Sequence, residues 1–217
     1  MIYIILGLLI AYLVGAIPSS VWYGRTVEGI DVREHGSGNA GATNTFRVLG
    51  KKAGSIVMAA DVLKGYLATS IPKYIALSQS WDTGTLVLWQ ILFGIVAVLG
   101  HIFPVYINFK GGKGVASLLG MVLAINLSGF LACLVIFLTV FLSTGIVSIG
   151  SMLAGVTYAT CMFFSYFNPE DLLSLKIFGI CGATLLIYTH RKNIERLIKG
   201  EENRIKIFGK GKASSQS

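Results

Sequence analysis

Long apolar stretches alternate with short polar loops along the whole chain. Three such stretches come first, at residues 2–23, 53–77 and 83–109, and only the second carries charged residues within it. A helix needs about 20 apolar residues to cross the hydrocarbon core of a membrane. Each stretch is therefore predicted to form one membrane-spanning helix.

The second half of the chain continues this pattern. Residues 114–169 carry no Asp, Glu, Lys or Arg, and the stretch is too long for a single span. Small polar residues interrupt its aliphatic pattern at 126–129 and 143–151, which leaves two or three crossings. A last apolar stretch follows at 172–189.

Composition and charge set the class and the orientation. With 54% hydrophobic and 13% charged residues, the chain is not an ordinary soluble domain. Its net charge of +8 is concentrated at residues 25–52, at 110–113 and from Arg191 onward. The positive-inside rule puts these segments in the cytoplasm, so the N-terminus is expected outside and the C-terminus inside. Basic residues in loops beside spans also make nucleic acid a disfavoured partner.

The parity of the crossings then requires three spans within 114–169. The sequence thus predicts an all-α fold, a polytopic integral membrane bundle of about seven transmembrane helices. Residues 1–208 are expected to form a single domain, and 209–217 a disordered basic tail. No cleavage site is evident after the first apolar stretch, which is expected to be retained.

Cysteine and metal-ligand patterns are uninformative. Cys133, Cys161 and Cys181 stand singly among apolar residues and have no partnering histidines. Neither a disulfide framework nor a metal site is supported. We therefore expect the protein to need no metal and no cofactor.

The most polar loop includes the segment Gly36–Arg47, which reads GSGNAGATNTFR. Its hydroxyls, amides and free backbone donors, together with the fork of Arg47, are typical of a site for an oxyanion. A helix is expected to begin between Ala40 and Phe46, with its N–H groups directed into the loop. A flexible linker is the alternative, but the segment has few true spacer residues, and we favour the anion site.

The central turn, Lys110–Gly114, interrupts the apolar pattern with the sequence KGGKG. Glycines leave backbone N–H groups uncovered, and the two lysines add positive charge, as in a phosphate or carboxylate cradle. A short basic turn between two membrane helices explains the same residues equally well. The turn alone does not separate these two interpretations.

Asp61 and Lys64 lie near the middle of an apolar stretch. A spacing of three residues puts both on one helical face, where they are expected to pair and to point into the bundle. They either support function or form a structural ion pair that fixes helix packing.

The last polar segment, Thr189–Arg196, brings His190, Asn193 and Glu195 to the point where the chain leaves the membrane. A basic segment there is often only a determinant of topology. His190 and Asn193, three residues apart on one face, favour a functional role. We expect this segment to meet the first loop, the central turn and the Ser148–Ser151 turn at the cytoplasmic face.

Three stretches together carry a resemblance to a known family. GSGNAGATNTFR at 36–47, LGHIFPVYINFKGGKGVA at 99–116 and THRKNIERLIKGEENR at 189–204 resemble the three cytoplasmic motifs of the PlsY family. These are bacterial membrane-integral glycerol-3-phosphate acyltransferases that use acyl phosphate. Motif order and spacing match over essentially the whole chain.

The resemblance implies an enzyme that transfers an acyl group from acyl phosphate to the 1-hydroxyl of glycerol 3-phosphate. The products are 1-acyl-glycerol 3-phosphate and phosphate, and the step is the first of bacterial phospholipid synthesis. A mixed anhydride needs no covalent acyl-enzyme, and no nucleophile elbow is visible in the sequence. We expect a monomer in the bacterial inner (plasma) membrane, in contact with lipid, with its active site on the cytoplasmic face.

The resemblance also implies roles for individual residues. Ser37 and Arg47 would support catalysis, while His190 and Asn193 would orient or deprotonate the attacking hydroxyl; the substrate's own phosphate is an alternative base. The residues implied in substrate binding are Gly38, Asn39, Thr43, Asn44, His101, Lys110, Gly111, Gly112, Lys113, Gly114 and Ser151, and those implied in support are Asp61, Lys64 and Glu195. Within the binding set, the glycines from 111 to 114 and Lys113 look like the cradle for glycerol phosphate.

Two other interpretations compete with this one. His190 and Glu195 nearly match the HxxxxD signature of acyltransferases that use thioesters, but Glu replaces Asp, and we interpret the match as coincidence. A small-anion transporter would also suit a chain with several spans and an intramembrane ion pair. No inverted repeat is apparent, however, and the polar residues gather at one face.

Overall fold

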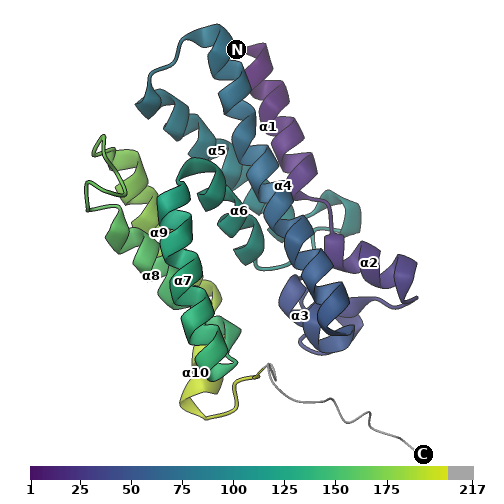
Figure 1. Ribbon diagram of the computed structural model, residues 1–217. Helices are drawn as coiled ribbons and strands as arrows, with labels where there is room; N and C mark the ends of the chain where they lie inside the picture. The colour runs from purple at the N-terminus through teal and green to yellow at the C-terminus, as the bar shows by residue number, and fades with distance from the viewer. Residues whose placement is uncertain (205–217) are drawn as a thin grey trace, which may run out of the picture.

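The computed structural model describes residues 1–204, which form ten α-helices and two short 3₁₀ helices without any β-strand (Figure 1). The all-α prediction is confirmed for these residues, and the tail predicted at 209–217 lies outside them. In chain order the elements are α1 (Ile2–Gly15), α2 (Ser19–Val27), η1 (Val32–Glu34), α3 (Ala42–Val48), α4 (Gly50–Gln79), α5 (Thr83–Ile102), η2 (Val105–Ile107), α6 (Val115–Ile125), α7 (Leu127–Thr144), α8 (Val147–Cys161), α9 (Leu173–Thr189) and α10 (Arg191–Ile198).

The first apolar stretch is broken, which the sequence analysis did not predict. The run at 2–23 was expected to be one helix, but α1 ends at Gly15 and α2 starts after Pro18, at a bend of 44°. Proline lacks an N–H group and its ring clashes with the preceding turn, so the helix cannot continue through it. At the break, the carbonyl of Ile17 accepts hydrogen bonds from the Ser19 N–H at 3.0 Å and from the Lys64 ammonium at 2.7 Å.

The helices α4 and α6 approach each other closely because small residues line their contact. A Cβ on Gly65 of α4 would overlap the carbonyl oxygen of Ser117 in α6, and a Cβ on Gly120 of α6 would overlap that of Val62 in α4. Small residues allow helix backbones to pack at short range, which is typical of membrane helices. This contact fixes the start of α6, and with it the turn that carries Lys113.

The breaks predicted within 114–169 are confirmed. Asn126 ends α6 and caps α7, because its side-chain oxygen accepts a 2.7 Å hydrogen bond from the N–H of Gly129. Gly145 ends α7 in the left-handed region, with a φ of 71°. Three helices, α6, α7 and α8, thus occupy the charge-free stretch.

Seven of the helices in residues 1–204 contain 11 residues or more, namely α1, α4, α5, α6, α7, α8 and α9. By length and composition, two helical segments, Thr83–Ile107 and Leu127–Thr144, are able to cross a membrane alone. Up to four spans result if the bent pairs α1–α2 and α9–α10 each count as one. The expected seven spans and the orientation of the termini stay predictions.

The helices form two groups (Figure 1). α7, α8, α9 and α10 lie on one side, α1 to α4 lie on the other, and α5 and α6 lie between them. α2, α3 and α10 are at the same end of the molecule, the lower end in the view. The first loop and the segment after α9, which were predicted to meet, are therefore at the same end of the molecule.

Candidate active site

A cavity of about 530 Å³ lies between the two helical groups. Its lining residues come from the first loop, between α2 and α3, and from α3, α4, α6, α7, α8, α9 and α10. His101 near the end of α5, the central turn and Glu202 after α10 complete the lining. Of the residues expected at a site, those that line the cavity are Ser37, Gly38, Asn39, Thr43, Asn44, Arg47, Asp61, His101, Lys113, Gly114, Ser151, His190 and Asn193. The tertiary structure brings these residues to one place from distant parts of the chain.

The two ends of the cavity differ in character. α8 contributes Ser148 near its first turn and Tyr158 ten residues later, about 15 Å further along the helix. α9 runs the other way, with Phe178 in its first half and His190 directly after its end. Both helices therefore place polar groups at the end near the loops and large aromatic side chains at the other end.

A chain of hydrogen bonds organises the polar end. The Lys113 Nζ donates to Asn193 Oδ1 at 2.7 Å, and Asn193 Nδ2 donates to Glu202 Oε1 at 2.7 Å. The same carboxylate accepts from Ser148 Oγ at 3.1 Å and from Arg196 Nε at 2.8 Å. One carboxylate after α10 thus ties the central turn, α8 and α10 together.

The charges at this end influence one another. Burial lowers the pKa of Lys113, and so does the positive charge of Arg196, whereas Glu202 opposes this effect. The pKa of the Lys113 ammonium is therefore below its ordinary value. Burial raises the pKa of Glu202, but hydrogen bonds from Asn193, Arg196 and Ser148 outweigh it and hold this pKa below its usual value. The carboxylate is thus ionised and partly neutralises the cations around it.

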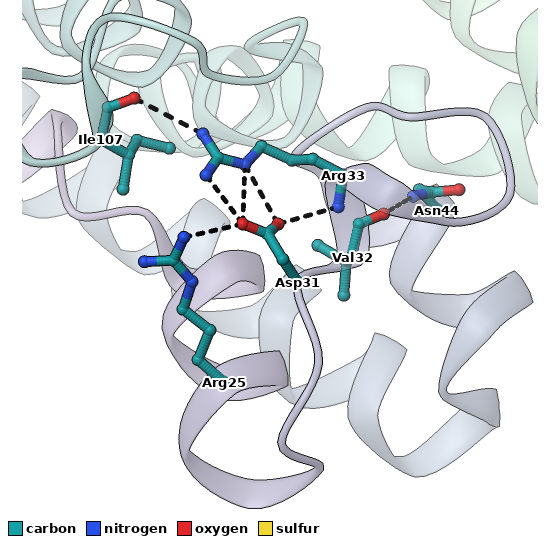
Figure 2. A network of polar contacts seen from close by, with 6 residues as sticks. All are labelled: Arg25, Asp31, Val32, Arg33, Asn44 and Ile107. Carbon is teal, nitrogen blue, oxygen red and sulfur yellow. Dashed lines mark hydrogen bonds and ion pairs between the residues drawn. The ribbon is translucent and has the colours of Figure 1, made fainter.

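A second network supports the first loop (Figure 2). Asp31 Oδ2 accepts from Arg33 at 2.7 Å and from Arg25 at 2.9 Å, and hydrogen bonds from Arg33 hold the pKa of Asp31 well below its usual range. Figure 2 shows the Arg33 guanidinium also reaching the carbonyl oxygen of Ile107, at 3.4 Å. This contact joins the first loop to the segment that precedes the central turn.

Asn44 connects this network to Ser37. It is fully buried in α3, and its amide nitrogen donates to the carbonyl oxygens of Val32 at 2.7 Å and His35 at 3.0 Å (Figure 2 shows the first). Its Oδ1 accepts from the Ser37 N–H at 2.8 Å and from the Ser37 hydroxyl at 3.1 Å. The helix expected to begin between Ala40 and Phe46 begins at Ala42 and carries this side chain.

The tautomer of His190 follows from its partner. Its Nδ1 is 2.8 Å from the carbonyl oxygen of Leu186, and since a carbonyl only accepts, Nδ1 carries the proton. In the neutral ring, Nε2 is then free to accept a proton. The ring is buried and lines the cavity, so this nitrogen has the chemistry of a general base.

Asp61 and Lys64 form the predicted ion pair, with 2.8 Å between Nζ and Oδ1. The Asp61 carboxylate also accepts from Ser19 Oγ at 3.0 Å. Asp61 lines the cavity, but Lys64 does not, because its ammonium turns to the break between α1 and α2. His101 Nδ1 lies 3.6 Å from Asp61, beyond hydrogen-bond distance.

Some expected site residues lie away from the cavity. The side chains of Lys110 and Glu195 are exposed, and neither residue lines the cavity. The N–H groups of Gly111 and Gly112 donate to the carbonyl oxygens of Ile102 and His101. Because those donors already have partners at the end of α5, the expected cradle reaches the cavity only through Lys113 and Gly114.

Ser148, Arg196 and Glu202 were missed as site residues. The sequence indicated Arg196 only as a basic position and Ser148 only as part of a turn. It gave Glu202 no role. Two signals marked Glu202: it is an acidic residue within a basic segment, and it lies in the third stretch that resembles the PlsY motifs. Its contacts follow from the turn after α10, which the helical spacing does not predict.

Known proteins of one family are similar to this chain over most of its length. The model of the family described as glycerol-3-phosphate acyltransferase matches residues 5–200. A glycerol-3-phosphate acyltransferase of Enterococcus faecalis is 41% identical over 207 residues, which cover 93% of this chain and 92% of that protein. That of Bacillus subtilis is 40% identical over 203 residues, covering 94% and 98%.

Solved structures agree with the sequence relatives. The crystal structure of PlsY (YgiH), an integral membrane glycerol 3-phosphate acyltransferase, in its glycerol 3-phosphate form matches with a TM-score of 0.81 and 35% identity. The match covers 94% of this chain and 96% of that one. The lysophosphatidic acid form matches with a TM-score of 0.77. The chain therefore belongs to the PlsY family of glycerol-3-phosphate acyltransferases, and it is an integral membrane acyltransferase.

Proposed function

We propose that this enzyme transfers a fatty acyl group from acyl phosphate to the 1-hydroxyl of glycerol 3-phosphate. The observation that carries the proposal is a single cavity with two chemically different ends. Arg47, Lys113 and Arg196 supply positive charge at one end, and apolar side chains of α7, α8 and α9 line the other. A long acyl chain that ends in a phosphate has this same division between a charged and an apolar part.

The comparisons support the acceptor in this proposal. The matched PlsY crystal structures carry the names of a glycerol 3-phosphate form and a lysophosphatidic acid form. These molecules are the acceptor and the product of the proposed reaction. Four basic residues that line the cavity, Arg47, Lys113, Lys192 and Arg196, also provide charge for two phosphate groups, one on each substrate.

The reaction is a direct displacement at the acyl carbon. The 1-hydroxyl oxygen forms a bond to the carbonyl carbon, and the bond from that carbon to the bridging phosphate oxygen breaks. The phosphate leaves with the electron pair, and the hydroxyl proton passes to His190 Nε2 or to a substrate phosphate, ending on inorganic phosphate. Arg47, which lines the cavity, is proposed to stabilise the charge on the leaving phosphate.

Direct attack needs no acyl-enzyme, because acyl phosphate is a mixed anhydride with a good leaving group. Among residues 1–204, no hydrogen bond joins a serine or cysteine side chain to a histidine. Such a bond is the usual mark of an activated nucleophile. The Ser37 and Ser148 hydroxyls donate instead to Asn44 and Glu202.

The proposed setting is the bacterial inner (plasma) membrane, with the polar end of the cavity at the cytoplasmic face and the protein as a monomer. The basic segments of the chain, at 25–52, 110–113 and beyond Arg191, support this orientation. The membrane-spanning helices would let an acyl chain enter from the lipid.

The test is acyl transfer by the purified full chain in lipid. Radiolabelled glycerol 3-phosphate is supplied with palmitoyl phosphate or palmitoyl-CoA, without added metal. We expect lysophosphatidic acid from the phosphate donor alone. Lys113→Ala should raise the KM for glycerol 3-phosphate about tenfold or more, since a charged hydrogen bond contributes about 1.5–3 kcal/mol.

Lys110→Ala is the matched control, because it removes an exposed lysine from the same turn. An equal loss in both lysine variants would mean that the turn contributes only general positive charge. Product from the thioester alone would contradict the proposed donor, and no product from either donor would favour the transporter.

A further inference from the structure

We propose that Asn44 fixes the hydroxyl proton of Ser37, so that the Ser37 oxygen meets the substrate only as an acceptor and binds a glycerol hydroxyl rather than phosphate. The inference rests on the proposed function, in that it assigns an orientation to glycerol 3-phosphate in the cavity. It makes Asn44 a positioning residue that acts through Ser37.

The orientation of the Asn44 amide is determined by its partners. One end of the amide faces the N–H of Ser37 at 2.8 Å, and an N–H only donates, so that end is the oxygen. The other end faces the carbonyl oxygens of Val32 and His35, which only accept, so that end is the nitrogen. The side chain is fully buried, and all four of its hydrogen-bonding positions are occupied.

The proton of the Ser37 hydroxyl is therefore also determined. Its Oγ lies 3.1 Å from Asn44 Oδ1, and an amide oxygen cannot donate, so the hydroxyl donates to Asn44. A hydroxyl has a single proton and two lone pairs. What the Ser37 oxygen offers to any other group is its lone pairs.

Two glycines allow this contact. Gly36 and Gly38, on either side of Ser37, have φ angles of 62° and 72°, which favour glycine. A Cβ on Gly36 would also lie 2.5 Å from Asn44 Oδ1, where it would displace the amide from Ser37. The exposed Ser37 lines the cavity, so its oxygen is available to a ligand.

An oxygen that only accepts discriminates between the two parts of glycerol 3-phosphate. A phosphate dianion offers only acceptors and gains nothing from the Ser37 lone pairs, whereas a glycerol hydroxyl has a proton to donate. The phosphate is then held by Lys113 and its cationic neighbours, and the glycerol hydroxyls face the first loop.

The first experiment uses ethyl phosphate, which carries no hydroxyl, as a competitive inhibitor against glycerol 3-phosphate. Ser37→Ala should lower kcat/KM for glycerol 3-phosphate about tenfold, the size of one lost hydrogen bond, while the inhibition constant of ethyl phosphate changes less than about twofold. Lys113→Ala should raise that inhibition constant about tenfold or more. If Ser37→Ala weakens ethyl phosphate as much as Lys113→Ala does, Ser37 binds phosphate and the inference is wrong.

The second experiment is a double-mutant cycle with Ser37→Ala and Asn44→Ala. If Asn44 acts through the Ser37 hydroxyl, Asn44→Ala changes kcat/KM less than about twofold once Ser37 is alanine. Fully multiplicative losses would overturn the positioning role. Thermal unfolding shows whether the Asn44 variants fold, since they lose the hydrogen bonds from the Asn44 amide to the carbonyls of Val32 and His35. The ethyl phosphate experiment does not depend on these variants.

Different results would contradict the proposed acyl transfer and the proposed orientation of glycerol 3-phosphate. Wild-type protein that does not acylate glycerol 3-phosphate contradicts the proposed function itself. Active wild-type protein whose Ser37→Ala variant loses affinity for ethyl phosphate contradicts only the orientation proposed for the substrate.

Discussion

The two sides of the polar end of the cavity are held in opposite ways. Around Ser37, every partner of the Asn44 amide is neutral and lies within residues 32–44. Around Lys113, the groups come from the central turn, α8, α10 and the segment after α10, and they depend on the single carboxylate of Glu202. A neutral acceptor can be oriented by its own loop, whereas a cluster of cations needs a counter-charge brought from elsewhere in the chain.

This difference has an electrostatic origin. Like charges at short range repel, and burial strengthens that repulsion because water no longer screens it. Glu202 opposes the effect of burial and of Arg196 on the Lys113 ammonium. The hydrogen bonds at Ser37 involve no ionised group, so we expect that side to respond to packing and the Lys113 side to respond to pH.

Gly36→Ala should have the largest effect on the neutral side. The change adds a Cβ 2.5 Å from Asn44 Oδ1 and strains a φ of 62°, so Ser37 loses its partner. Activity should fall about tenfold, as expected for Ser37→Ala, and the strain should also lower the unfolding temperature. Gly29→Ala is the matched control, because Gly29 has a φ of 71° but nothing within 4 Å of the new Cβ. Steady-state kinetics and unfolding temperatures of both variants check this; equal losses of activity would remove Asn44 from the explanation.

Glu202→Gln should have the next largest effect, on the charged side. Glu202 raises the pKa of Lys113, so its neutralisation lowers that pKa further below 10.5. The alkaline limb of kcat/KM for glycerol 3-phosphate, where Lys113 loses its proton, should therefore move to lower pH. A pH profile measures the shift, and Glu201→Gln, which changes an exposed neighbour, should leave the limb in place.

Asp31→Asn should have the smallest effect, because it weakens only the support under the first loop. Its pKa is lowered in the folded state, so the carboxylate contributes stability above its ordinary pKa of 3.8, and that contribution is lost as the pH falls below it. At neutral pH, we expect a loss of about 1 kcal/mol, typical of a partly exposed ion pair. Chemical unfolding at two pH values tests this, with Glu28→Gln as an exposed control; an unchanged stability would show that Arg33 holds Ile107 without Asp31.

Sequence patterns predicted structural features that depend on residues close together in the chain. The helix ends at Asn126 and Gly145 follow from small polar residues within an aliphatic run, and the pairing of Asp61 with Lys64 follows from helical spacing. Pro18 was also a local signal, and its omission made one predicted helix out of α1 and α2. At this break the carbonyl of Ile17 accepts from the Lys64 ammonium, which explains why Lys64 turns away from the cavity.

Hydrogen-bond partners outside the regular helices were not predictable in this way. Gly111 and Gly112 have the composition of an anion cradle, yet their N–H groups are used by the end of α5. Asn44 has the chemistry of a ligand for phosphate, yet its amide is filled by its own loop. In both cases, the sequence shows which donors exist but not which of them already have partners.

The sequence by itself determined the membrane class, the three polar loops and the helical segments apart from the break at Pro18, because hydrophobic length and loop charge act locally along the chain. Only the tertiary structure decided which members of those loops line the cavity and that Glu202 joins Lys113, Ser148 and Arg196. Hydrogen bonds and ion pairs require an approach to about 3 Å, and the packing of helices far apart in the sequence determines which groups come that close.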